Sequence, residues 1–299
     1  MKLNPSSTSF PKRAELPPID GAPQGAAWFW GKDDELGRLN LLTPSRVLAA
    51  KDLIKKGEII NLDWRVDLPN PPAFGRQAFK HTISPLGEAG FDDLYELNTQ
   101  SGSQLTKEEI HNSDRCGMQA WAAHGIAGRG ILIDYWAYTK SHYDPLTTHR
   151  ISLHDVKTIA QEKNILFQPG DILFIRSGFV ARYSHLSADE RAHLGTLQIP
   201  EHTFAGVAQT EEMVDFLHDN WFSAVVGDAP AFEAWPPPQE RSLHQYLLPR
   251  WGVPIGEMWD LEGLAKKCEE EGRWEFFVTS SPANVHGGVG SHANAVAIF

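Results

Sequence analysis

The segment GDAPAFEAWPPPQERSLHQYLLPRWGVPIGE, residues 227–257, gathers most of the candidate site chemistry of this chain. It follows the apolar run FSAVV, residues 222–226, which is typical of a buried strand. Such a strand would deliver Gly227 and Asp228 to a loop at its C-terminal end, where α/β sheets usually hold ligands. The segment therefore predicts a site at the edge of a sheet, with the rest of the chain as its scaffold.

Within this segment, a short apolar-periodic stretch carries His244, and a turn rich in Pro and Gly presents Glu257. Imidazole and carboxylate groups both suit Zn²⁺ or Mn²⁺. The spacing leaves two interpretations open. The pair either shares a metal ion, or His244 is a hydrogen-bonded histidine of the core.

Strand and helix patterns alternate along the chain, which predicts one α/β domain. Thr43 and Pro44 have the pattern of an N-cap and a first helical residue, and Thr210 that of another N-cap. Alternation of apolar and polar residues predicts a strand over residues 58–66, and an apolar run predicts a buried strand over residues 131–136.

The N-terminal residues 1–27, rich in Pro, Ser and Ala, are interpreted as an arm that wraps the surface or stays mobile. The predicted domain then covers residues 28–299.

Composition restricts the classes of function. The 299 residues include 27 basic and 38 acidic ones, a net charge of −11, which disfavours nucleic-acid binding and favours a small-molecule substrate. Cys116 and Cys268 form no CxxC pair, so we expect a reducing compartment. No apolar run approaches the length of a membrane span, and we expect a cytoplasmic protein without membrane contact.

Five separated motifs, in order, resemble the cyclase family of metal-dependent hydrolases: HGIAGRGILIDY, GDAPAFE, LHQYLL, WGVPIGEMWDLEGLA and FFVTSSPANVHGGVGSHANAVAIF. This family includes bacterial-type kynurenine formamidases and isatin hydrolases, and the chain is most similar to its longer, fungal-type branch. The resemblance implies a mixed β-sheet with surrounding helices in the swivelling β/β/α arrangement. It also implies a homodimer or larger homo-oligomer.

The implied activity is hydrolysis of an amide-type C–N bond in an aryl formamide or a cyclic amide, by water on one or two Zn²⁺ or Mn²⁺ ions. By this resemblance His244 and Glu257 are metal ligands, and Gln104 is a ligand or an oxyanion contact.

Three further residues are candidates for substrate binding. Trp64 suits an aromatic pocket, although the core is an alternative place for it. His124 lies in a family-like stretch, and Gly288 belongs to a glycine-rich loop whose backbone N–H groups would face the substrate unless the loop is only a tight turn.

The chain departs from the family pattern after Gln104. There the fungal-type branch has a Trp-Asp and an Arg-His, which help hold the metal and shuttle a proton, but this chain continues directly with LTKEE. His111 and Asp114 are substitutes to consider, although a polar loop is the simpler interpretation. A true deletion and an exon lost from a gene model both fit. The departure supports an alternative to the hydrolase, which is a catalytically inactive binding or regulatory relic of the fold. A polyketide-type cyclase is the second alternative.

Overall fold

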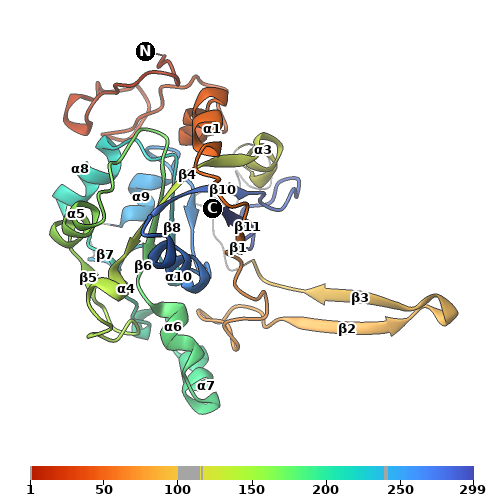
Figure 1. The fold of residues 1–299 in the computed structure, drawn as a ribbon. Helices are drawn as coiled ribbons and strands as arrows, with labels where there is room; N and C mark the ends of the chain where they lie inside the picture. Colours follow the sequence, from red (N-terminus) through yellow and green to blue (C-terminus); the bar gives the residue numbers. More distant parts are fainter. Residues whose placement is uncertain (1, 100–114, 116, 239–241) are drawn as a thin grey trace.

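The computed structural model describes residues 2–99, 115, 117–238 and 242–299. Its centre is a seven-stranded mixed sheet in the order β1-β11-β10-β4-β6-β8-β9 (Figure 1). The strands of this sheet are β1 (Ile59–Asn61), β4 (Ile126–Asp134), β6 (Ile172–Arg176), β8 (Ala224–Gly227), β9 (Ile255–Gly256), β10 (Glu275–Ser280) and β11 (Ala295–Ile298). Strands β4, β6, β8 and β9 run parallel, whereas β10, β11 and β1 pair with antiparallel neighbours.

Helices and short strands surround this sheet. The helices are α1 (Pro44–Lys51), α3 (Met118–His124), α4 (Tyr135–Tyr138), α5 (Leu153–Glu162), α6 (Phe179–Ser184), α7 (Ala188–Thr196), α8 (Glu211–Asp219), α9 (Leu243–Leu247) and α10 (Glu262–Glu271). The short strands β5 (Arg150–Ile151) and β7 (Gly206–Val207) pair in parallel. Helix α1 packs against β4 and β10, α5 against β4 and α8, and α10 against β1 and β4. No helix of the described segments is long and apolar enough to cross a membrane.

The predicted α/β class with a mixed sheet is confirmed. Side chains of Thr43 and Thr210 accept backbone N–H groups at the starts of α1 and α8, as the cap pattern predicted. The buried strand predicted at residues 131–136 is β4, which ends at Asp134 because Asp134 caps the short helix α4.

The strand predicted over residues 58–66 was wrong in its length, because β1 has only three residues. Its partner β11 begins at Ala295, and the backbone pairing ends there with the N–H of Leu62 donating to the carbonyl of Ala295 at 3.0 Å. The Asp63 carboxylate instead accepts the N–H of Ala295 at 2.6 Å. A side chain here takes the place of the next ladder bond.

A two-stranded hairpin, β2 (Lys80–Pro85) and β3 (Phe91–Glu96), projects from the body (Figure 1). Every residue of both strands is exposed, including Ile83 and Phe91. The chain leads from the hairpin directly to the site, because residues 97–99, which follow β3, line the cavity described below.

The N-terminal arm, residues 2–27, lies along the body. Phe10 stacks on Trp221 with ring centroids 4.5 Å apart, and Arg46 donates to the carbonyl of Ser7 at 2.6 Å. Arg13 donates its backbone N–H to Asp219 at 2.7 Å. These contacts join the arm to α1, to α8 and to the segment that follows α8.

Beneath the arm lies a buried polar cluster. His218 is fully buried between Trp221 and Trp251, with ring centroids 5.4 and 5.0 Å away, and its Nδ1 is 2.8 Å from Asp219. The guanidinium of Arg38, also fully buried, lies 3.6 Å from the centroid of the Trp221 ring. Burial, together with the charges of Arg38 and Arg13, lowers the pKa of His218 to about 2.

We expect this histidine to make the fold acid-sensitive. Its folded pKa lies below the unfolded value, so the unfolded chain binds more protons below about pH 6.5, and stability falls by about 1.4 kcal/mol per pH unit as pH drops further. Between pH 7.5 and 5.0, the free energy of unfolding measured with urea should fall about 2 kcal/mol more in the wild type than in His218→Gln. His154→Gln, at an exposed position, is the matched control. Equal pH slopes in the wild type and His218→Gln would contradict this account.

Candidate functional site

Two neighbouring parallel strands end at the same edge of the sheet and bring the segment around residues 227–257 together. In the β8–β9 pairing, Val225 lies opposite Ile255 and Val226 opposite Gly256. The loop after β8 therefore meets the residue after β9. The backbone N–H of Phe232 donates to the Glu257 carboxylate at 2.8 Å.

Glu233, on the same loop, holds the helix that carries His244. Its side chain is fully buried and accepts hydrogen bonds from Ser242 Oγ at 2.8 Å and from the backbone N–H of Leu243 at 2.7 Å. A third bond joins Glu233 Oε1 to His244 Nδ1 at 2.7 Å. The carboxylate thus satisfies backbone donors at the N-terminus of α9 and fixes the imidazole ring as well.

This arrangement turns the other imidazole nitrogen toward the second carboxylate. His244 Nε2 lies 3.2 Å from Glu257 Oε1. Burial alone would lower the pKa of His244, but the hydrogen bonds and charges of Glu233 and Glu257 outweigh it and raise the pKa to about 10. Burial would raise the pKa of Glu233, but its hydrogen bonds with His244, Leu243 and Ser242 hold the pKa below its usual range.

His244 and Glu257 line a large cavity of about 1580 Å³. Its walls carry aromatic side chains, among them Trp28, Trp64, Phe74 and Trp235. The ring of Phe74 lies 6.1 Å from that of Trp235. A cavity of this size and lining accommodates an aromatic small molecule.

The structure places the other predicted site residues in different ways. Trp64 lines the cavity and packs edge-on against Tyr183, with centroids 5.1 Å apart. Among the described residues, neither His124 nor Gly288 belongs to the cavity lining. His124 is exposed at the end of α3, and the carbonyl of Gly288 accepts the N–H of Met118 at 2.8 Å.

Gln104, His111 and Asp114 lie outside the described residues. Within the described segments, no group of three or more His, Cys, Asp or Glu side chains is placed to hold a metal ion. His244 and Glu257 are thus two candidate metal donors, and the described part of the chain supplies no complete shell.

Sequence reasoning missed Glu233 and the loop residue Arg76, which also lines the cavity. Glu233 had one available signal, because it is an acidic residue in the otherwise apolar run APAFEAW that follows a buried strand. Arg76 had none, because its loop has no periodic pattern and meets the site only through tertiary packing.

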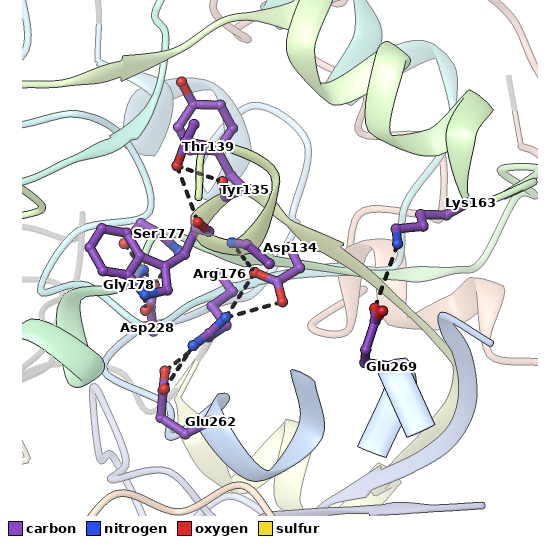
Figure 2. A network of polar contacts seen from close by, with 12 residues as sticks. Asp134, Tyr135, Thr139, Lys163, Arg176, Ser177, Gly178, Asp228, Glu262 and Glu269 are labelled. Carbon is purple, nitrogen blue, oxygen red and sulfur yellow. Dashed lines mark hydrogen bonds and ion pairs between the residues drawn. The ribbon is translucent and has the colours of Figure 1, made fainter. Parts of the chain in front are cut away.

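A second polar network supports the same sheet edge (Figure 2). Asp134 and Arg176 lie opposite each other at the ends of β4 and β6, and Arg176 Nη1 is 2.9 Å from Asp134 Oδ1. On its other side Arg176 Nη2 donates to Glu262 of α10 at 2.7 Å. The Asp228 carboxylate, after β8, accepts the backbone N–H groups of Ser177 at 2.7 Å and of Gly178 at 2.8 Å. These bonds tie together the loops that follow β6 and β8.

Comparisons with known proteins agree with this architecture. A solved structure described as a novel cyclase is 27% identical, with a TM-score of 0.78, over 90% of this chain and 98% of that one. Isatin hydrolase A from Ralstonia solanacearum shares the fold at 13% identity, with a TM-score of 0.58, over 86% of this chain and 98% of that one. An isatin hydrolase bound to the product analogue thioisatinate gives 14% identity and a TM-score of 0.58, over 84% of this chain and 96% of that one.

No curated protein sequence matches the chain. The model of the putative cyclase family, however, matches residues 46–234, well over half of the sequence. That match runs from α1 to the loop that carries Glu233. The chain belongs to the putative cyclase family.

Proposed function

We propose that this chain is a metal-dependent hydrolase of an amide-type C–N bond in an aryl formamide or a cyclic amide. The observation that carries the proposal is the imidazole of His244, held on one side by buried Glu233 and facing Glu257 in an aromatic-lined cavity. The shared fold with isatin hydrolases, whose name gives a cyclic aryl amide as substrate, supports the same reaction class.

The donor chemistry of the site fits a divalent cation. A histidine that ligates a metal through one ring nitrogen usually gives its other N–H to a carboxylate, as His244 Nδ1 does with Glu233. Nε2 and the Glu257 carboxylate then converge on one point, with nitrogen and oxygen donors that suit Zn²⁺ or Mn²⁺. His244 and Glu257 would hold the ion, and Glu233 would orient the ring.

A bound divalent cation supplies Lewis-acid polarisation of the amide carbonyl and lowers the pKa of water toward neutrality. The chain's own residues position the substrate. The aromatic walls that include Trp64, Phe74 and Trp235 bury the aryl part of the substrate and exclude bulk water from the scissile bond. Hydrolysis adds the hydroxyl of water to the acyl carbon, breaks the C–N bond and transfers a proton to the nitrogen that leaves.

Replacing the carboxylate behind the histidine should weaken the site. Glu233→Gln keeps the size of the side chain but loses the charge that orients His244, so we expect the affinity for Zn²⁺ or Mn²⁺ to fall roughly 10- to 100-fold. Calorimetric titration of the purified chain measures this. Ser242→Ala removes only one hydrogen bond to Glu233 and should change affinity far less. Unchanged affinity in Glu233→Gln would show that Glu233 does not support a metal ligand.

The activity itself is tested with N-formylkynurenine and isatin as substrates, alongside metal content per chain by elemental mass spectrometry. The wild type should hold near-stoichiometric metal and hydrolyse at least one of the two substrates. His244→Ala should lose the metal, and its turnover should fall by roughly 100-fold or more. His124→Ala, outside the described cavity lining, should keep both. A metal-loaded wild type that hydrolyses neither compound would favour a cyclase, and a wild type without metal would favour the inactive relic.

A further inference from the structure

The loop ahead of the hairpin brings a cation to the cavity. Arg76 is half-buried and lines the same cavity as His244 and Glu257. Phe74 fixes this loop, because its ring packs against His202 with centroids 4.7 Å apart and its backbone N–H is 3.4 Å from His202 Nε2. Arg76 also lies over Phe74, with its guanidinium carbon 5.3 Å from the ring centroid. The guanidinium is thus held at the wall of the site by a packed aromatic side chain.

Two other well-buried arginines of this chain have fixed carboxylate partners, although the fully buried Arg38 packs on Trp221 instead. Arg176 is bound by Asp134 at 2.9 Å and by Glu262 at 2.7 Å. Arg129 is likewise bound by Asp171 at 3.1 Å and by Glu275 at 2.7 Å. Pairing of this kind offsets the cost of withdrawing a charge from water.

Arg76 lies at the cavity wall and differs from Arg176 and Arg129. Within the described residues its guanidinium forms no hydrogen bond and no ion pair, although the charge of Glu257, which lines the same cavity, acts on it. Burial lowers the pKa of Arg76, and Glu257 only partly opposes that effect. The guanidinium at the cavity wall carries five N–H donors in a planar fork, and no carboxylate of the described residues is bonded to them.

We propose that Arg76 binds a carboxylate carried by the ligand, so that the site takes aryl amides or formamides that bear an anionic group. The planar fork of arginine matches a carboxylate in bidentate fashion, and Phe74, Trp64 and Trp235 supply apolar wall for the ring that carries it. The inference rests on the proposed hydrolase function for the identity of the scissile bond, but the binding of the carboxylate does not depend on turnover.

The experiment compares two ligands that differ only in charge, 2-aminobenzoate and 2-aminobenzamide, by calorimetric titration of the full chain as purified. The wild type should bind the carboxylate about tenfold or more tightly than the neutral amide. Arg76→Met should lose that preference while its affinity for 2-aminobenzamide stays within about twofold. Its thermal midpoint should not fall, because the substitution removes a half-buried cation that has no ion-pair partner among the described residues.

Arg250→Met is the matched control. Arg250 is also half-buried and lies over an aromatic ring, that of Tyr246 at 4.3 Å, but it is not among the described residues that line the cavity. The control should keep the wild-type preference. Equal affinity of the wild type for both ligands overturns the proposal. A preference for the carboxylate that persists in Arg76→Met also overturns it, because the carboxylate would then be bound by a metal ion and not by Arg76. Loss of both ligands in Arg76→Met overturns it too.

The kinetic counterpart separates this inference from the hydrolase proposal. With 2-formamidobenzoate and 2-formamidobenzamide as substrates, Arg76→Met should raise KM for the carboxylate about tenfold and leave kcat and the neutral substrate largely unchanged. A chain that turns over neither compound but still shows the Arg76-dependent binding preference would refute the hydrolase and retain the carboxylate site.

Discussion

The buried carboxylate of Glu233 is the constraint on which the site depends. It accepts backbone and hydroxyl donors at the start of α9 and, in addition, a ring nitrogen of His244. An ionised carboxylate without these donors would be costly in such a buried place, so the loop, the helix and the imidazole stabilise one another. These hydrogen bonds of Glu233 orient the His244 ring, so that Nε2 points toward Glu257.

The site also depends on the sheet, because the loops that follow the parallel strands must be held in fixed positions relative to one another. Asp228 binds the backbone at Ser177 and Gly178, and Arg176 bridges Asp134 to α10 (Figure 2). These groups are fully partnered among themselves, so their role is to join strand ends and not to contact ligand. The contrast with Arg76 is physical, because one arginine completes a network and the other faces a cavity.

Much of the framework could be predicted from local sequence. The cap residues Thr43 and Thr210 and the apolar run of β4 act over a few neighbours, so their patterns survive into the fold. The length of β1 depended instead on where β11 begins, which no local pattern records. The mixed α/β class and the family followed from motifs spread along most of the chain.

The site was harder to predict in full because Arg76 is distant in sequence from His244 and Glu257. His244 and Glu257 come from one segment, and the structure brings their side chains together. Arg76 reaches the same cavity through a loop that is held only by tertiary packing. The predicted roles of Gln104 stay predictions, since Gln104 lies outside the described residues. His124 and Gly288 are described, but neither belongs to the described cavity lining.

X-ray diffraction from crystals grown with Mn²⁺, with anomalous scattering used to locate the ion, would show whether His244 and Glu257 converge on a cation. We expect an ion bonded to Nε2 of His244 and to the Glu257 carboxylate, with Nδ1 still bonded to Glu233. An ion bound elsewhere, or His244 still hydrogen-bonded directly to both glutamates at saturating Mn²⁺, would contradict this expectation.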